Sequence, residues 1–199
     1  VYQYNLSVSV YAQVIPYLLF GKSVFVTRAV TVFVSLLAAW AVGVILREFF
    51  EIPYWWAGVF LLSIAPAWFL HSRTAFETAL MVSFYTGFLY CYLMYRYRQP
   101  RYLYAAILLG ALTFYTYSPG QMIMAVSAVF LFFSDIRYHW QNRKYILIGL
   151  ALLVLLAIPY ARFQLTHSQS TENHLRSLNS YWIRDIPLTE KLGIYFMEY

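Results

Sequence analysis

Long apolar runs, each close to the length that crosses a bilayer, dominate the pattern of this chain. A membrane-crossing helix needs about 20 mainly apolar residues. Residues 102–134 carry no charge, but as one helix they would be about 50 Å long, against a hydrocarbon core of about 30 Å. Ser118-Pro119-Gly120 divides this stretch into two spans. The pattern therefore predicts an all-α fold, a polytopic transmembrane bundle with six spans near residues 29–46, 52–70, 78–95, 102–117, 119–133 and 145–160.

Two prolines and the two ends of the chain complete the expected organisation. Pro66 should kink the second span near its far end, and Pro159 should end the last one. Residues 5–20 mix polar and apolar side chains and are short for a span, which favours a helix lying in the membrane interface. The expected domains are a juxtamembrane helix and turn over residues 1–22, the transmembrane bundle over 23–160, and a loop over 161–199.

Composition excludes a soluble domain. Hydrophobic residues make up 62% of the 199 residues and charged residues only 11%, whereas a soluble domain carries about 25% charged residues. The aromatic content of 21% suits a bilayer, where Trp and Tyr settle at the headgroup level. The net charge of +6 resides in short loops between apolar runs, which is typical of membrane loops and argues against nucleic acid as a partner. Cys91 is the only cysteine, so an internal disulfide is impossible.

Lys and Arg are distributed unevenly over the connections between the spans. Only Arg73 falls in the second and fourth connections. Because cytoplasmic loops carry an excess of Lys and Arg, we predict that the first, third and fifth connections are cytoplasmic. The juxtamembrane helix, the turns at 71–77 and 117–120, and the tail from residue 161 then lie on the outer face. The seven basic residues of the predicted cytoplasmic side are Arg47, Arg96, Arg98, Arg101, Arg137, Arg143 and Lys144.

Arg73 and Glu77 are an ionisable pair at the outer end of the third predicted span. Being four residues apart, they can form a simple helical ion pair, worth a few tenths of a kcal/mol. Ionisable groups at a membrane boundary also tend to face a cavity or a partner. In that case Glu77 could hold a divalent metal ion, or position a phosphate-bearing substrate through one. The spacing alone leaves both interpretations open.

Other polar residues of the predicted outer face also have two interpretations. Lys22 and Arg28 can bind lipid phosphate, or they can extend to the interface as basic side chains commonly do. Tyr115 and Tyr117 can line a sugar site or form part of an interfacial aromatic belt. The segment after the last span contains five basic or histidine residues, which are Arg162, His167, His174, Arg176 and Arg184. They are typical of a solvated loop, and their spacing matches no metal-binding signature.

The sequence contains no phosphate loop, dinucleotide fingerprint, nucleophile elbow or zinc-protease helix, but the order of three short motifs is informative. They are Leu19-Phe20-Gly21-Lys22-Ser23 with Phe25 and Arg28, then Ala65-Pro66 with Ser72-Arg73 and Glu77, and finally Tyr115-Thr116-Tyr117-Ser118-Pro119. This order resembles the GT-C membrane glycosyltransferases, in the branch that contains protein O-mannosyltransferases and lipid A aminoarabinose transferases. The resemblance extends over nearly the whole chain, including a long outer segment after Pro159.

The chain departs from the family pattern in several respects, two of which concern the acidic residues of the site. In the family, a first span and an outer loop with the acidic motif that holds the catalytic base come before the segment matched here. We therefore expect this chain to be an internal part of a longer protein, with the base upstream of Val1. Many members carry Asp at the second acidic position, where this chain has Glu77.

The resemblance implies transfer of a sugar from a polyprenyl- or dolichyl-phosphate carrier to a glycan, lipid or protein acceptor on the outer face. An acceptor hydroxyl would attack the anomeric carbon with the help of a base and displace the lipid phosphate. Glu77 would organise the site, by hydrogen bonding or through a metal ion. Arg73, Arg28 and Arg162 would stabilise the departing phosphate, and Tyr117 would contact substrate. The expected location is a bacterial inner membrane.

Two other functions are compatible with a polytopic bundle. A transporter or flippase usually needs buried charges or helix pairs broken by Gly or Pro within its spans, and the spans predicted here lack them. A non-catalytic membrane subunit with the same fold would share every feature described above, because the expected catalytic base lies outside this sequence.

Overall fold

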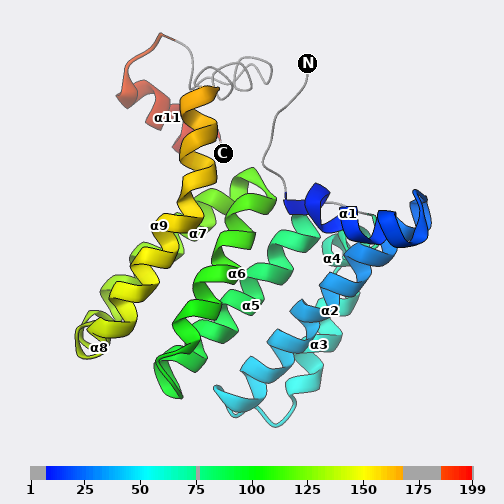
Figure 1. Ribbon diagram of the computed structural model, residues 1–199, viewed down its shortest axis with the longest axis horizontal. Helices are drawn as coiled ribbons and strands as arrows, with labels where there is room; N and C mark the ends of the chain where they lie inside the picture. Colours follow the sequence, from blue (N-terminus) through cyan, green and yellow to red (C-terminus); the bar gives the residue numbers. More distant parts are fainter. Residues whose placement is uncertain (1–7, 75–76, 168–184, 199) are drawn as a thin grey trace. The chain divides into compact units, whose positions relative to one another are not determined.

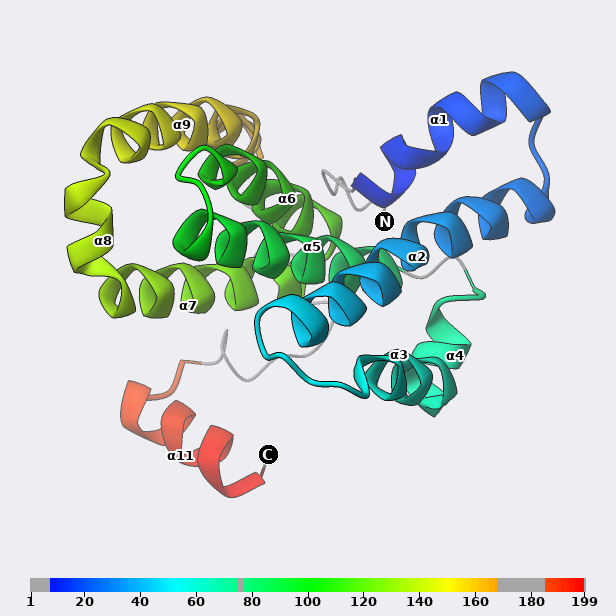
Figure 2. The same cartoon turned by 90° about the horizontal axis from the view of Figure 1, so that it is seen from below.

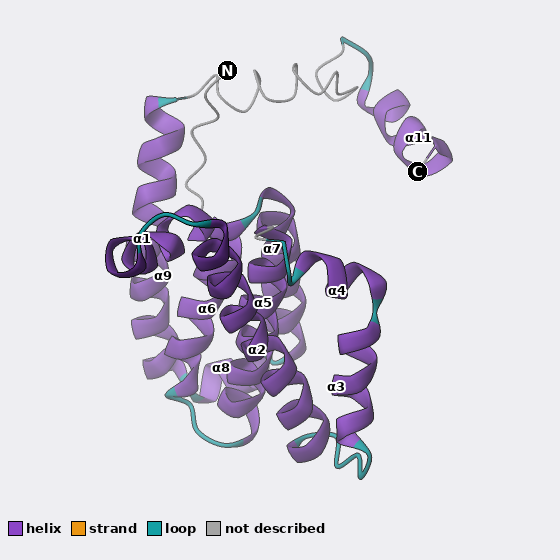
Figure 3. Cartoon of the chain, turned by 90° about the vertical axis from the view of Figure 1, so that its right-hand side faces the viewer, coloured by secondary structure: helices purple, strands orange, loops and turns teal. Residues whose placement is uncertain are grey.

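The computed structural model describes residues 8–74, 77–167 and 185–198. The described ranges contain helices and no strand, which confirms the all-α class (Figure 3). The helices are α1 (Val8–Phe20), α2 (Val24–Glu48), α3 (Trp55–Ile64), α4 (Pro66–His71), α5 (Glu77–Tyr97), α6 (Tyr102–Thr116), α7 (Ser118–Ser134), α8 (Ile136–Gln141), α9 (Arg143–Thr166) and α11 (Leu188–Glu198).

Leu6–Leu156 form a helical bundle with α5 at its centre. Helix α5 packs between α2 and α6, α3 packs on α2, and α7 packs on α6 (Figures 1 and 2). Small residues permit the close approach, as is usual between helices in membranes. A side chain at Gly87 of α5, for example, would meet Leu37 of α2 and Leu109 of α6.

The surface of this bundle is apolar where a soluble protein would be polar. Phe33 of α2 is 76% exposed and Phe130 of α7 is 72% exposed, and many other large apolar side chains are exposed on the same helices. Exposed apolar surface of this extent requires a lipid surrounding. Helices α2 and α9 are each long and apolar enough to cross a bilayer, whereas α3, α6 and α7 are apolar but shorter. The protein is thus a polytopic membrane bundle, and the count of six spans stays a prediction.

The connections alternate between the two ends of the bundle as the charge pattern predicts. The turns after α2, after α5 and around α8 lie at one end, and the turns before α2, before α5 and before α7 lie at the other (Figure 1). The first end carries the seven basic residues named above. We call it the basic end, and we call the opposite one the α1 end, because α1 crosses the bundle there.

The second predicted span, residues 52–70, is broken into α3 and α4. Ala65, which precedes Pro66, has φ −59° and ψ 121°, outside the helical region. The proline ring clashes with the preceding residue when that residue is helical and so drives it into an extended conformation. The predicted kink at Pro66 is therefore a break in the helix, and α4 continues from the proline as its first residue.

The expectation that Pro159 ends the last span is wrong. Helix α9 continues through Pro159 to Thr166. A proline removes one backbone hydrogen bond and bends a helix, and an apolar helix can continue on both sides of such a bend.

Residues 161–199 are also not simply a loop. Beyond the end of α9, α11 begins directly after Pro187, a residue type favoured at helix starts, and it has Leu188 and Leu192 one turn apart. The described residues from Ala157 onward belong to a second compact unit. Within it, the Gln164 side-chain amide donates to the Tyr160 hydroxyl at 3.0 Å.

Candidate functional site

Glu77 is the first residue of α5, at the α1 end of the bundle. An acidic side chain in the first turn of a helix interacts favourably with the unpaired N–H groups there. Its carboxylate oxygen Oε1 accepts a hydrogen bond of 3.0 Å from the hydroxyl of Ser9 in α1. Ser9 is buried, being only 5% exposed. This hydrogen bond thus joins α1 to α5 through two residues that are 68 positions apart along the chain.

Arg73, four residues before Glu77, has a different contact. Its guanidinium lies over the ring of Phe69, 3.7 Å from the ring centroid. The described residues do not place it in an ion pair with Glu77. The cation is exposed, and stacking on a ring leaves the N–H groups at the edge of the guanidinium able to bind an anion.

Arg28 lies in the second turn of α2, close to the helix start at the α1 end. The preceding turn is set by Ser23, whose Oγ accepts from the backbone N–H of Val26 at 3.1 Å; this is the usual N-cap arrangement. Arg28 is exposed. It therefore shares an end of the bundle with Glu77 and Arg73, as predicted, and its role in binding substrate stays a prediction.

Tyr117 occupies the turn between α6 and α7 and has extended backbone dihedrals. The turn packs tightly through Gly120, where a Cβ would lie 2.7 Å from the Thr113 carbonyl oxygen and 3.0 Å from Met81 Cγ. Met81 is one helical turn beyond Glu77 on α5. Gly120, the residue after the tyrosine-rich motif, thus lies close to α5 one helical turn beyond Glu77.

Arg162 lies in the last two turns of α9, in the unit formed by Ala157–Tyr199. Its backbone carbonyl accepts from the Thr166 hydroxyl at 2.8 Å, so the residue is helical rather than in a loop. His167 ends this segment with its ring stacked on Phe163. His174, Arg176 and Arg184 lie outside the described residues.

The described residues do not by themselves complete a metal site. No group of three His, Cys, Asp or Glu side chains comes together in the described ranges. The oxygen groups recorded at Glu77 include its carboxylate and the Ser9 hydroxyl, whereas Mg²⁺ and Ca²⁺ take six or more oxygen ligands, several of them often water. A divalent ion at Glu77 stays a prediction that requires ligands from elsewhere.

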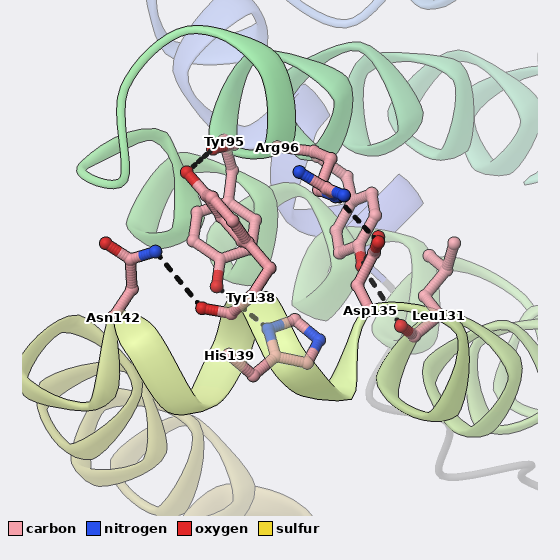
Figure 4. Close-up of polar contacts among 8 residues, drawn as sticks. Tyr95, Arg96, Leu131, Asp135, Tyr138, His139 and Asn142 are labelled. Atoms are coloured by element: carbon pink, nitrogen blue, oxygen red, sulfur yellow. Dashed lines mark hydrogen bonds and ion pairs between the residues drawn. The ribbon is translucent and has the colours of Figure 1, made fainter.

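A polar cluster at the basic end was not predicted from the sequence. Asp135, between α7 and α8, accepts from Arg96 Nε at 2.7 Å and from the Tyr92 hydroxyl at 2.8 Å (Figure 4). Both donors come from α5. The guanidinium of Arg96 also lies over the ring of Tyr138, 4.6 Å from its centroid. Asp135 is the first charged residue after the long uncharged stretch, and Arg96 lies near the end of a predicted span on the same side. These opposite charges at helix ends on one side of the bundle were the sequence feature that could have predicted the ion pair.

Tyr95 and His139 extend this cluster into the bundle. The Tyr95 hydroxyl and His139 Nδ1 are 2.8 Å apart, and Tyr138 donates from its hydroxyl to the Tyr95 carbonyl at 2.8 Å (Figure 4). The His139 ring stacks on Tyr95 and on Phe132. Burial lowers the pKa of the His139 imidazole from its usual 6.5 because the charged form loses solvation. These contacts attach α8 to α5, so the cluster stabilises the packing of these helices at the end of the bundle opposite Glu77.

Comparison with known proteins agrees with the order of motifs and with the helical architecture. The family described as dolichyl-phosphate-mannose-protein mannosyltransferase matches residues 8–162, from the first residue of α1 to the last turns of α9. Comparisons with curated proteins and with solved structures gave no match. The match covers the bundle, the Glu77 segment and the tyrosine-rich turn. The chain therefore belongs to the dolichyl-phosphate-mannose-protein mannosyltransferase family, a family of membrane glycosyltransferases of the GT-C type.

Proposed function

We propose that this protein moves a sugar from a polyprenyl-phosphate-linked donor to a glycan, lipid or protein acceptor on the outer face of a bacterial inner membrane. Its family supports glycosyl transfer within a membrane. The location that we propose for the site is supported by the polar contacts that meet at the α1 end of the bundle. There the Ser9 hydroxyl donates to the Glu77 carboxylate, and Gly120 of α7 lies close to Met81, one helical turn beyond Glu77 on α5.

The side chains of this end suit a sugar phosphate. Arg73 and Arg28 are exposed cations, and a guanidinium matches the geometry of a phosphate with two parallel hydrogen bonds. Tyr117 supplies an aromatic ring and a hydroxyl beside the same turn. Arg162 belongs to the other compact unit, and its binding of the lipid phosphate stays a prediction from the sequence.

The transfer requires a base, a nucleophile and stabilisation of the leaving group. The acceptor hydroxyl loses its proton to a base and its oxygen forms a bond to the anomeric carbon. The bond between that carbon and the phosphate oxygen breaks, and its electron pair stays with the lipid phosphate. Arg73 and Arg28 stabilise this negative charge, and Glu77 orients the reacting groups. No described residue is assigned here as the base.

The test is turnover by the full-length protein reconstituted in liposomes with a polyprenyl-phosphate-mannose donor labelled in the sugar. Label is followed into lipid, glycan and protein fractions of added membranes, and release of polyprenyl phosphate is measured alongside. We expect Glu77→Gln to lower kcat by about 100-fold, because removing one oriented polar group from a transfer site costs about that factor. Glu77→Asp should retain part of the activity.

The matched control is Glu48→Gln, which removes an exposed carboxylate at the basic end and should leave turnover unchanged. Unchanged turnover in Glu77→Gln would remove Glu77 from the site. A wild-type protein that is thermally stabilised by the donor but transfers no sugar would instead indicate a non-catalytic subunit.

A further inference from the structure

Helix α1 presents its side chains in an unusual way. Its one buried residue within the described range is the polar Ser9, whereas large apolar residues of the same helix are exposed. Ile15 is 69% exposed and Leu18 is 80% exposed. In a membrane interface these apolar side chains face lipid. The face of α1 that meets the bundle, in contrast, includes the buried hydroxyl of Ser9. A buried hydroxyl needs a hydrogen-bond partner, and here one partner is the Glu77 carboxylate at 3.0 Å.

A second polar attachment fixes the other end of α1 independently. The Tyr17 hydroxyl donates to Gln13 Oε1 at 2.7 Å, within α1. It also makes a short hydrogen bond with the Thr27 hydroxyl of α2. Helix α1 is therefore held at Tyr17 near its end and at Ser9 near its start, and of these two contacts the one at Ser9 reaches Glu77.

We infer that Ser9 is a positioning residue for Glu77, and that α1 is a working part of the transfer site. This inference rests on the proposed function, in which Glu77 organises the reacting groups. A carboxylate at a helix start can adopt several rotamers, and a buried donor on a neighbouring helix selects among them. Ser9 does not need to touch the substrate for this role. It acts by fixing the position of the Glu77 carboxylate through Oε1.

The test uses Ser9→Ala and Ser9→Thr in the full-length protein in liposomes, with the polyprenyl-phosphate-mannose donor. We expect Ser9→Ala to lower kcat about tenfold with little change in the KM for the donor, since a hydrogen bond to a charged group is typically worth about that factor. Ser9→Thr keeps a hydroxyl and should recover most of the rate. A Ser9→Ala protein with wild-type kcat, or a Ser9→Thr protein as slow as Ser9→Ala, would overturn the inference.

Two further variants separate positioning from simple attachment of α1. Tyr17→Phe removes the hydroxyl at the other end of the helix and should leave kcat within about twofold of the wild type; a loss equal to that of Ser9→Ala would mean that only docking of α1 matters. In the Glu77→Asp background, the shorter carboxylate should not reach Ser9, so Ser9→Ala should cause little further loss. An undiminished loss in that background would contradict the proposed route through residue 77.

The outcomes also distinguish this inference from the proposed function. If Glu77→Gln retains full turnover, the proposed site fails and the role of Ser9 fails with it. If Glu77→Gln is inactive while Ser9→Ala turns over normally, the proposed function stands and the inference about Ser9 is wrong.

Discussion

Replacement of Asp135 by alanine tests whether the polar cluster at the basic end holds α8 on the bundle. Asp135 is 16% exposed and accepts from Arg96 and Tyr92, both on α5. The ion pair with Arg96 is worth about 1 kcal/mol at most, because the arginine side chain is 37% exposed and solvent screens the interaction. The Tyr92 hydroxyl loses a charge-assisted bond but can still donate to the Leu131 carbonyl at 3.1 Å, which leaves a cost of about 1 kcal/mol. The expected loss of stability is therefore about 2 kcal/mol.

The measurement is the apparent unfolding temperature of the purified protein in detergent, at one fixed scan rate, because membrane proteins often unfold irreversibly. A loss of about 2 kcal/mol corresponds to about 4–8 °C for a chain of this size. Asp135→Asn keeps an oxygen that can accept from Tyr92 and should lose about half as much. Glu48→Gln, an exposed acid at the same end, is the control and should change little. If Asp135→Ala unfolds at the temperature of that control, the cluster does not stabilise the fold and the reasoning is wrong.

Two further predictions concern packing and pH. Gly120→Ala should lower the unfolding temperature clearly, because the new Cβ would lie 2.7 Å from the backbone oxygen of Thr113. The control is Gly193→Ala in α11, where nothing lies within 4 Å of the new Cβ, and it should be neutral or slightly stabilising. Equal effects of the two substitutions on the unfolding temperature would contradict this account. The folded state lowers the pKa of His139 below 6.5, so the unfolded chain binds the proton more readily than the folded one. The stability contributed by this residue is therefore present above about pH 6.5 and is lost as the pH falls through the folded-state pKa. Unfolding temperatures measured from pH 7.5 to 5 should fall less steeply in His139→Gln than in the wild type, and parallel curves would show that His139 does not carry the effect.

The sequence by itself determined the class of the fold and the course of the chain. Apolar runs of nearly bilayer length have few alternatives to helices, since lipid offers no partners for exposed backbone groups. The division of residues 102–134 into two helices followed from local chemistry, and the structure has the boundary at Tyr117, directly before Ser118-Pro119-Gly120. The alternation of basic and non-basic connections between the two ends also followed, because each span reverses the direction of the chain. The order of short motifs indicated the family that the comparison then established.

Local rules failed where the consequence of a residue depends on its surroundings. A proline that ends a helix in water can lie inside one in an apolar setting, as Pro159 does. Pro66 did more than kink the second span, because the residue before it left the helical region altogether.

Only the tertiary structure decided which polar side chains meet. The bond from Ser9 to Glu77 joins residues 68 apart in sequence, and the contact between Arg96 and Asp135 joins residues 39 apart. The spacing of Arg73 and Glu77 left an ion pair and a role facing a cavity or partner both open, and the structure gives the arginine an aromatic ring as its contact. The physical reason is that a hydrogen bond forms only within about 3 Å and with suitable direction. Those conditions depend on how neighbouring helices pack against each other, which the hydrophobic pattern of a single helix does not specify.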